Sequence, residues 1–585
     1  MRRLHAVAAA LRPAASRRHA SPTARPLSSA SAGPLLVGLD SGTQSIKACV
    51  FDTSGSALAS GSAPQAVSNP ADGLAEQDIG EWRRGLFAAV RDALAAVPSD
   101  RRGPVAAIGL SFQRESFTLV SADSATGEPL APLRDAILWL DGRADGEVEK
   151  LRAGSAEPEL SAELYHQLTG KPLDVTSALA RMRWLAEHEP ALTHADFRFV
   201  DCGAVLSHAL TDELVTCVAG ADTCGLIDLH TRGWSDPVLA AAGLTPTQMP
   251  RLAEPGEVIG GVTAAAAAEL GGAVGEGCPV VAAGGDGQVF NLGMSAEGVG
   301  GDGMMLTLGT SVVLSLNSAT PAIAPAYRTL AAAEPGQDGA HAYTCESVVQ
   351  SGTLILKWFV DEFGAGDDFS HWEKEASALP PGSEGLMTVP HFWCEKNARL
   401  RLLALASDVS GTEPAVLRLR GCRFPDNRPS LRGATLGWSH LHGKAHLYRS
   451  VLEGLCLELR RAADAMPVGS DGDQTVYVGG GGAQSDLLLS ILADALNRPV
   501  EAAAEAGGES VALGAALLAA RGAGVLHDFA PVASVAAGQD ARVFQPDAGR
   551  AAQYEQLYRR VYCPLLEAAT PLSAELSAIC NPGLA

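Results

Sequence analysis

Paired cysteines, long apolar runs and positive charge are all scarce in this chain of 585 residues. The 11 cysteines are scattered, with no Cys-x-x-Cys pair and no cysteine–histidine cluster at zinc spacing, so we expect reduced thiols in a reducing compartment. The longest weakly charged apolar run, residues 262–283, is interrupted by Glu269 and Glu276, which argues against a membrane-spanning segment. The net charge of −22 argues against nucleic acid or an anionic membrane as the main partner.

Two familiar nucleotide-binding patterns are missing as well. The four glycines at 479–482 do not form a Gly-x-x-x-x-Gly-Lys-Ser/Thr loop, and they lack Rossmann spacing to an acidic residue about 20 positions on. They nevertheless lie between an apolar strand, residues 475–478, and a predicted helix. Such a turn presents unpaired backbone amides at a helix start, which suits a nucleotide. The candidates in this turn are Gly481, Gly482, Ala483 and Ser485.

No acidic residue precedes Asp40, whereas the first 33 residues hold six arginines and many alanines and serines. This composition predicts an organelle transit peptide at residues 1–33, for a mitochondrion rather than a plastid. A disordered basic tail from a misplaced start codon is the alternative, and it would leave a cytoplasmic protein. With 47% hydrophobic and 19% charged residues, the chain has a globular composition and is long enough for two or more domains.

A strand–turn–strand pattern opens the globular part. Two apolar runs, residues 36–39 and 46–51, flank a polar segment centred on Gly42, whose backbone freedom suits a tight turn and a closely approaching ligand. Asp40 is a candidate magnesium ligand, and Lys47 supplies positive charge for a phosphate. Phosphate donors in the turn are Gly42, Thr43, Gln44 and Ser45. An ordinary surface hairpin is the alternative, because Asp, Gly and Thr are common in turns.

A second hairpin repeats this form at residues 304–316, where an apolar strand, a Gly-Thr-Ser turn and another apolar strand follow one another. Its turn residues Gly309, Thr310 and Ser311 are further candidates for phosphate binding. Because each hairpin opens about half of the chain, the pair suggests two related lobes that hold one phosphate chain between them.

Polar residues follow two predicted strands at residues 105–110 and 136–139. Side chains just after the strands of an α/β sheet lie where ligands bind. This makes substrate-binding candidates of Gln113, Arg114 and Glu115. The alternative for Arg114 and Glu115 is a surface ion pair of little energetic value.

A lone carboxylate follows two glycines in Gly284-Gly285-Asp286, directly after an apolar strand at 279–283. Asp286 could cap the next helix. We favour a general base: the glycines would let a hydroxyl approach, and the carboxylate would accept its proton as the oxygen attacks phosphorus.

Other segments are expected to support packing. Helical periodicity is found in residues 79–97, 177–188 and 446–459. The second of these helices is expected to bury Trp184 in the core. Residues 345–347 are expected to form a loop that leads into a helix. The leucine- and arginine-rich residues 395–423 are either a surface insertion or untranslated sequence wrongly included in the gene.

Taken in order, the first hairpin, Gly284-Gly285-Asp286 and the second hairpin resemble the FGGY carbohydrate kinases of the actin-like ATPase superfamily. The resemblance implies an α/β fold of two ribonuclease-H-like lobes with a central cleft. It places the N-terminal lobe at residues 34–290, the C-terminal lobe at 291–530 and an extension at 531–585. It also implies ATP and Mg²⁺ as cofactors, Asp286 as the catalytic base and Asp40 on the metal side. Its substrate-binding residues would be Gln113, Arg114, Glu115, Trp139, Asp222 and Asp286.

The resemblance leaves the acceptor open. Leu138-Trp139 and Asp141-Gly142-Arg143 look like the matching segments of xylulokinases, which favours a ketopentose such as D-xylulose. Gln113-Arg114-Glu115 is similar to the glycerol-kinase version of its segment, so glycerol or another polyol is the alternative. Arg181 stands where lysine is usual in this family. A catalytically silent, actin-like ATP-binding protein is therefore a further alternative. The expected partners are ATP and a small sugar or polyol, with a homodimer as a further option.

Overall fold

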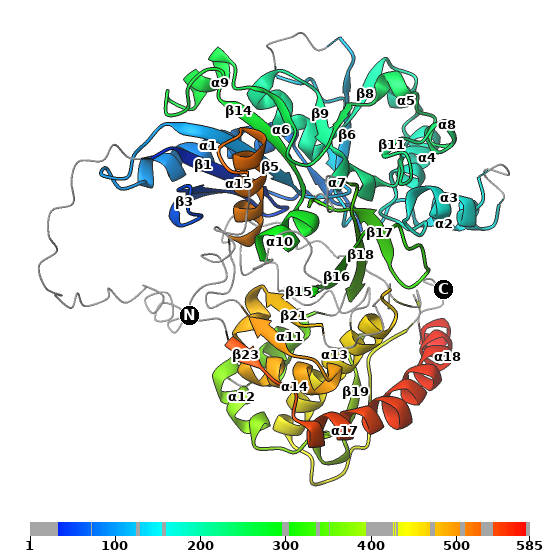
Figure 1. Ribbon diagram of the computed structural model, residues 1–585. Helices are drawn as coiled ribbons and strands as arrows, with labels where there is room; N and C mark the ends of the chain where they lie inside the picture. The colour runs from blue at the N-terminus through cyan, green and yellow to red at the C-terminus, as the bar shows by residue number, and fades with distance from the viewer. Residues whose placement is uncertain are drawn as a thin grey trace, which may run out of the picture. The chain divides into compact units, whose positions relative to one another are not determined.

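The computed structural model describes most of the chain from residue 33 on (Figure 1). The described residues are 33–71, 73–123, 129–154, 160–294, 303–309, 311–334, 340–349, 352–364, 366–392, 425, 428, 431–467, 474–502, 509–527 and 542–580. Residues 1–32 of the predicted transit peptide, the predicted insertion 395–423 and Thr310 lie outside them. None of the helices so described is both long and apolar enough to cross a membrane.

The first half of the chain, residues 33–294, is built on a six-stranded sheet in the order β13-β14-β5-β1-β2-β3. The predicted hairpin is confirmed, since β1 (Leu35–Ser41) and β2 (Ser45–Phe51) pair antiparallel. β5 (Val105–Phe112) and β14 (Pro279–Gly285) run parallel to β1, so the carboxyl ends of these three strands lie at one edge of the sheet. The flanking strands are β3 (Ala57–Pro64) and β13 (Val258–Gly261).

Alternate residues of β1 and β2 enter two different apolar cores, so helices cover both faces of the sheet. On one face lies α1 (Ile79–Ala96), which confirms the predicted helix and buries Trp82, Leu86 and Val90. The side chain of Asp78 caps its start by accepting a hydrogen bond from the Gly80 amide.

The other face of the sheet is covered by α15 (Ser510–Gly522), which lies beside β1 in Figure 1. Added Cβ atoms at Gly38 and Gly109 would lie 1.8 and 2.0 Å from carbonyl oxygens of this helix, so only glycine permits the contact. α15 comes late in the sequence but packs on the sheet of the first half. The predicted boundary between the lobes at residue 290 stays a prediction.

A four-stranded sheet and short helices complete the first half. The sheet has the order β4-β7-β6-β8, with β4 Glu76–Gln77, β7 Ala136–Ile137, β6 Phe117–Ser121 and β8 Phe197–Asp201. The strand predicted at 136–139 therefore covers only two residues. The helices are α2 (Asp145–Arg152), α3 (Ala162–Thr169), α4 (Ala178–His188), α5 (Pro190–Thr193), α6 (Cys202–Thr211), α7 (Val218–Ala221), α8 (Asp236–Ala241), α9 (Ala264–Glu269) and α10 (Asp286–Met294). The short strands are β9 (Val215–Cys217), β10 (Ile227–Asp228), β11 (Gly233–Trp234) and β12 (Arg251–Ala253).

The prediction that α4 buries Trp184 in the core is confirmed only in part, since Trp184 packs against an apolar core without being fully buried. Trp184 is half-buried and stacks on His188, with ring centroids 4.4 Å apart. The fully buried long side chain of this helix is Arg181. Its guanidinium donates to four backbone carbonyls, those of Val175, Glu115, Trp139 and Asp141. These hydrogen bonds compensate for the desolvation of the charge. Hydrophobic periodicity alone does not predict such a buried arginine.

The second half, residues 303–580, contains a seven-stranded sheet in the order β17-β18-β16-β15-β21-β22-β23. The second predicted hairpin is confirmed, since β15 (Met304–Leu308) and β16 (Val312–Ser318) pair antiparallel. The other strands are β17 (Arg328–Ala331), β18 (Tyr343–Val349), β21 (Val476–Gly479), β22 (Val500–Ala502) and β23 (Arg542–Phe544). A two-stranded sheet is formed by β19 (Met387–Val389) and β20 (Ala434–Leu436).

The loop predicted at residues 345–347 is wrong, because these residues lie within β18. This strand pairs with β16 on one side and β17 on the other, and all seven of its residues are buried. Its polar sequence is compatible with an interior strand because neighbouring strands satisfy the backbone and arginines neutralise Glu346.

Helices surround this second sheet, and the last of them belong to the C-terminal extension. They are α11 (Leu354–Phe363), α12 (Phe369–Ser377), α13 (Lys444–Asp464), α14 (Asp486–Leu496), α17 (Ala548–Leu557) and α18 (Cys563–Cys580). The extension is held to α13 by buried hydrogen bonds: Tyr554 donates to Glu453 over 2.9 Å, and Tyr562 donates to Glu458 over 2.6 Å.

Candidate active site

Two carboxylates meet at the sheet edge where β1, β5 and β14 end. Asp40 lies near the end of β1 and pairs in register with Ser111 of β5, while Asp286 follows β14 directly and begins α10. Burial raises the pKa of Asp40 to about 7, the charge of Asp286 adds to the rise, and Lys47 opposes it. Neighbouring carboxylates in such a setting disfavour each other's ionisation and attract a cation or a proton.

The first turn is closed by a hydrogen bond from the Gly42 amide to the Ser45 carbonyl, at 3.0 Å. Beside it, the Thr43 hydroxyl accepts from the indole Nε1 of Trp139 at 2.8 Å and donates to Gln113 Oε1 at 3.2 Å. Three predicted site residues that are distant in sequence are thus joined around one hydroxyl. The Gln44 carbonyl accepts from the Gln65 amide at 2.8 Å.

Lys47 follows the turn on β2, opposite Asp40 in the strand register. Its ammonium lies 3.2 Å from the carboxylate of Glu509, which immediately precedes α15, and both side chains remain partly exposed. The predicted positive charge is therefore present beside the turn, with a carboxylate as a partner.

Gln113 and Glu115 are bound to protein groups. Gln113 is buried, and besides Thr43 it contacts Ser116 and Gln77. Glu115 is also buried and adopts a left-handed backbone conformation, with φ of 61°. Its Oε1 atom accepts hydrogen bonds from Lys171 (2.8 Å), Thr176 (2.9 Å) and Arg328 (2.6 Å). Contact of Gln113 and Glu115 with substrate stays a prediction.

Arg114 points the other way, to the candidate base. Its Nε atom lies 3.0 Å from Oδ1 of Asp286, an oxygen that also accepts from the Gly287 amide at 2.7 Å. The Arg114 side chain is 11% exposed and that of Asp286 is 38% exposed. The surrounding protein raises the pKa of Asp286, and the Arg114 guanidinium partly offsets the rise. A carboxylate with raised proton affinity that retains access to solvent suits a general base.

The glycines around Asp286 have a structural role that the sequence did not predict. Added Cβ atoms at Gly285 and Gly287 would each lie 2.6 Å from atoms of the Arg114 side chain. The missing side chains thus make room for Arg114, which crosses the strand end. Gly284 has φ of +136°, and a Cβ there would lie 2.4 Å from the Ala219 carbonyl oxygen, so its role is backbone geometry. The approach of a substrate hydroxyl past these glycines stays a prediction.

Asp222 is buried and connects the halves of the chain. Its Oδ2 atom accepts from the Ala331 amide at 2.6 Å, and its Oδ1 accepts from the Gly220 amide and from Gln288 Nε2. Burial raises the pKa of Asp222 to about 6, although the amide hydrogen bonds oppose the rise. Asp222 thus supports Gln288, two residues after Asp286, and its contact with substrate stays a prediction.

Sequence reasoning missed three charged residues next to this site. Arg114 Nη1 donates to Glu346 at 2.7 Å, and Arg328 Nε donates to Glu346 at 2.6 Å. Arg328 Nη1 also donates to Glu115, which accepts a further hydrogen bond from Lys171. We call this series the charge chain; its members are Asp286, Arg114, Glu346, Arg328, Glu115 and Lys171. No local pattern marked Glu346, Arg328 or Lys171, because each becomes informative only through a partner from a distant segment.

The remaining predicted residues form a second group around the turn of β15 and β16. The Gly309 amide donates to the Ser311 carbonyl at 3.2 Å, and the Gly309 carbonyl accepts from the amide and hydroxyl of Thr353. The glycine-rich turn lies against it: added Cβ atoms at Gly480 and Gly482 would lie 2.7 and 2.8 Å from atoms of Leu308. The second hairpin and the glycine-rich turn are therefore neighbours.

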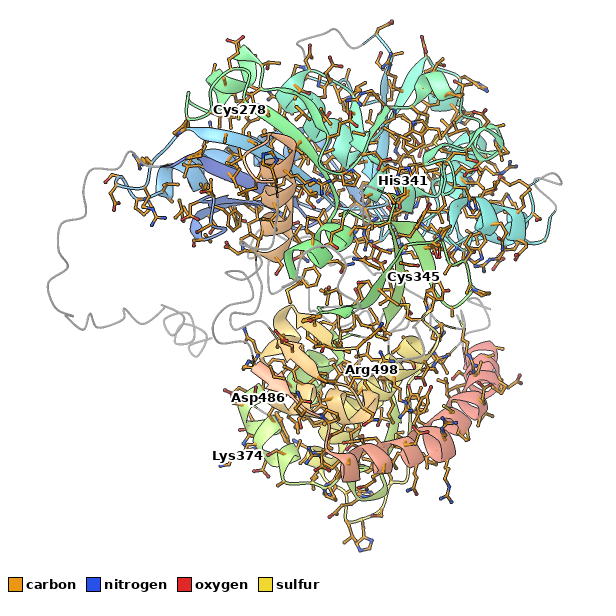
Figure 2. The ribbon with its side chains drawn as sticks, in the orientation of Figure 1. Cys278, His341, Cys345, Lys374, Asp486 and Arg498 are labelled. Carbon is orange, nitrogen blue, oxygen red and sulfur yellow. The ribbon has the colours of Figure 1, made fainter. Side chains whose placement is uncertain are left out.

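In the glycine-rich turn, some of the predicted residues have free space around them and others hold the local structure. An added Cβ at Gly481 would meet nothing within 4 Å. Ser485 caps α14, since its hydroxyl accepts from the Leu488 amide at 3.1 Å. The carbonyl of Ala483 and the carboxylate of Asp486, labelled in Figure 2 at the start of α14, both accept from Arg542 of β23.

Comparison with known proteins agrees with this architecture. The family model for the N-terminal domain of the FGGY family of carbohydrate kinases matches residues 35–293, and that for the C-terminal domain matches residues 304–523. The glycerol kinase of Nocardia farcinica (strain IFM 10152) is 28% identical over 495 residues, which cover 83% of this chain and 89% of that protein. The xylulose kinase of Escherichia coli (strain K12) is 28% identical over 545 residues, which cover 91% and 99%.

The fold is also similar to a solved structure. The xylulose kinase from Rhodospirillum rubrum superposes with a TM-score of 0.77 at 24% identity, covering 92% of this chain and 99% of that one. This similarity confirms the predicted α/β fold of the two-lobe, actin-like type. The chain belongs to the FGGY family of carbohydrate kinases and is a phosphotransferase with an alcohol as acceptor.

Proposed function

We propose that this chain transfers the γ-phosphate of ATP to a primary hydroxyl of a small sugar, with Asp286 as the general base. The observation that carries the proposal is the position of Asp286 at the end of β14, beside Asp40 and 3.0 Å from Arg114. Ligands of α/β folds bind at the carboxyl ends of parallel strands, which is where these three side chains meet.

The chain's own residues account for the proton transfer. An Oδ atom of Asp286 accepts the hydroxyl proton as the acceptor oxygen attacks phosphorus, and the raised pKa of Asp286 favours that transfer. Arg114 holds the carboxylate in place through Nε and remains 11% exposed, so it can also orient the acceptor. Positioning and charge compensation supply most of the catalysis in phosphoryl transfer.

The residues near Asp40 fit a magnesium ion bound with a nucleotide. Mg²⁺ usually takes one or two carboxylates and completes its shell with water and phosphate oxygens. Asp40 provides such a carboxylate, and the described residues contain no cluster of three or more His, Cys, Asp or Glu that would hold a metal alone. When bound, the ion neutralises charge on the phosphates. Lys47, opposite Asp40 in the strand register, supplies the protein's share of that neutralisation.

For the acceptor we propose a ketopentose such as D-xylulose. The xylulose kinase of E. coli aligns over 91% of this chain, and Trp139, from the xylulokinase-like segment, is tied to Thr43 of the phosphate turn. Glycerol is the second candidate because of Gln113-Arg114-Glu115 and the similar glycerol kinase. Here, however, the Glu115 carboxylate is engaged by Lys171, Thr176 and Arg328, which weakens the argument from that match.

The test is a coupled ADP-release assay with xylulose, ribulose, sedoheptulose, glycerol and gluconate, with Asp286→Ala as the control for uncoupled hydrolysis. A kcat/KM that is highest for a ketopentose supports the proposal, and one highest for glycerol selects the second candidate. If none of the acceptors is phosphorylated while ATP still binds, the proposal fails and a silent ATP-binding protein is favoured.

A further inference from the structure

The edge of the second sheet is joined to the first half beside Asp286. β17 is the edge strand of that sheet, and its outward amides find acceptors in the first half. The Thr329 amide donates to the Gly170 carbonyl at 2.8 Å, and the Ala331 amide donates to Asp222 at 2.6 Å. An edge strand with unpaired amides is a liability, and here the first half satisfies it. The contact therefore fixes β17 and its neighbour β18 next to the candidate base.

Glu346 lies at the centre of this contact. It is the register partner of Arg328 across β17 and β18, and only 1% of its side chain is exposed. Two guanidiniums hold its carboxylate, those of Arg114 from the first half and Arg328 from β17. Burial alone would raise the pKa of Glu346, but the two guanidiniums outweigh it and lower the pKa to about 2. Glu346 is therefore ionised throughout the working pH range.

Glu346 determines which nitrogen of Arg114 can contact Asp286. Nη1 of Arg114 is shared by Glu346 at 2.7 Å and Gln288 at 3.2 Å, whereas Nε faces Asp286 at 3.0 Å. A guanidinium presents its donors in a rigid planar fork, so fixing Nη1 fixes the direction of Nε. A carboxylate on the second half thus orients the arginine that contacts the base on the first half.

We propose that Glu346 is a positioning residue for phosphoryl transfer: by binding Nη1 of Arg114, it leaves Nε to Asp286 and fixes how the base faces the acceptor hydroxyl. The proposal rests on the function proposed above. It assigns to β18 a direct influence on a base that lies in the other half of the chain.

The second consequence is electrostatic. Arg114 shares its charge between two carboxylates, Asp286 and Glu346. The pKa of Asp286 is therefore higher than it would be if Arg114 paired with Asp286 alone. The charged groups that shift the pKa of Asp286 are Arg114, which lowers it, and Glu346 and Glu115, which raise it. Asp286 in turn raises the pKa of two neighbouring groups, Asp40 and Cys202. Glu346 raises the pKa of Asp286 in two ways: by its own negative charge, and by binding Arg114, which weakens the effect of the arginine on Asp286.

The test is the variant Glu346→Gln, which keeps the size and one acceptor oxygen but removes the charge. We expect kcat to fall roughly 10- to 100-fold with KM for ATP unchanged, because the acceptor and base are misaligned. We also expect the acidic limb of the kcat/KM profile to move to lower pH, because the whole Arg114 charge then acts on Asp286. Glu346→Asp keeps the charge, so it should lower kcat while leaving that limb in place.

The matched control is Glu458→Gln. Glu458 is an equally buried glutamate of the second half, held by His391, Arg461 and Tyr562 and outside the charge chain. Its loss should lower the melting temperature and leave the acidic limb where it is. The proposal is overturned if Glu346→Gln behaves like this control, or if its acidic limb moves to higher pH. Should Glu346→Gln not fold, an unchanged kcat in Glu346→Asp overturns it.

A second readout needs no enzymatic activity and so separates this proposal from the proposed function. The difference in melting temperature between the wild type and Asp286→Asn, measured as a function of pH, follows the ionisation of Asp286. The same difference in a Glu346→Gln background should titrate at lower pH. A titration that is unchanged or moves to higher pH would refute the positioning role even if no acceptor were ever found, and one that moves to lower pH would uphold it.

Discussion

Arg114 lies across Gly287 and reaches Asp286, with Nε of the arginine 3.0 Å from Oδ1 of the aspartate. The pair joins two segments of the chain that are 172 positions apart. It places a permanent positive charge against a carboxylate that the surrounding protein would otherwise keep protonated more readily. The proton affinity of the candidate base is thus a balance between burial and the carboxylates of Glu346 and Glu115, which raise it, and Arg114, which lowers it.

Replacing Asp286 should separate chemistry from nucleotide binding. Asp286→Ala is expected to lower kcat by roughly 10²- to 10⁴-fold, the usual contribution of a general base, while the Kd for ATP stays within about threefold. ADP release with the best acceptor measures the first quantity, and calorimetric titration with ATP measures the second. Asp286→Asn, which keeps the shape, should lose activity to a similar extent. Near wild-type turnover by either variant would remove Asp286 from the mechanism.

Gly287→Ala should impair activity without unfolding the protein. The added methyl would lie 2.6 Å from Nη2 of Arg114, so the guanidinium that Glu346 and Gln288 hold must shift. Because this shift disturbs the buried Arg114–Glu346 ion pair, we expect the melting temperature to fall by roughly 2–8 °C while the protein still folds. The Arg114–Asp286 contact should be lost, and kcat should fall by roughly tenfold or more.

The control for this variant is Gly146→Ala in α2. An added Cβ at Gly146 meets nothing within 4 Å, and alanine favours a helix more than glycine does. This control should be slightly stabilised and fully active. Equal kinetics in both variants would show that the Arg114 position does not matter for turnover.

The elements that sequence reasoning located are those with a local signature. Both hairpins are defined by alternating apolar runs around a glycine turn, and the glycine-rich turn before α14 is marked by composition alone. The position of Asp286 after a buried strand was visible in the same way. In each case the information is contained within about 20 consecutive residues.

The contacts that sequence reasoning missed are set by tertiary structure. Glu346 and Arg114 are 232 positions apart, and Arg328 and Glu115 are 213 apart, so neither ion pair leaves a mark in any window of the sequence. The burial of Arg181 was not predicted, because a buried charge contradicts the apolar pattern of a helix until its four carbonyl partners are known. The role of Gly287 depended on knowing which side chain passes over it.

The C-terminal extension should contribute to stability and not to catalysis. Tyr554 donates to Glu453 at 2.9 Å and accepts from Arg449 at 3.2 Å, all within the interior of the second half. Tyr554→Phe removes a donor from a buried carboxylate and should lower the free energy of unfolding by about 1–3 kcal/mol, with kcat and KM unchanged. Chemical denaturation followed by fluorescence measures the first, and the coupled assay measures the second.

Tyr448 offers a matched control on α13. It is fully buried, and its hydroxyl has no hydrogen-bond partner in the part of the chain that the structure describes. Tyr448→Phe should therefore be neutral or stabilising, since an unpaired buried hydroxyl costs free energy. A larger loss of stability in Tyr448→Phe than in Tyr554→Phe would contradict the assigned hydrogen bonds.

Asp40 should make the ligand-free protein less stable as pH rises. The pKa of Asp40 is about 7 in the folded protein and 3.8 in the unfolded chain. Between these two pH values the folded protein therefore holds a proton that the unfolded chain has lost. Stability therefore falls as pH rises through this window, and the loss is complete above about pH 7. Asp40→Asn does not ionise, so its advantage in melting temperature over the wild type should be absent near about pH 4 and largest above about pH 7.

Nucleotide should reverse that advantage. Mg²⁺ with ATP favours the ionised carboxylate, so at about pH 8 the ligand should raise the melting temperature of the wild type much more than that of Asp40→Asn. Differential scanning fluorimetry across pH, with and without the ligand, measures both effects. An advantage of Asp40→Asn that is the same at every pH would show that Asp40 does not titrate in this window. An equal response of both proteins to the ligand would remove Asp40 from the metal site.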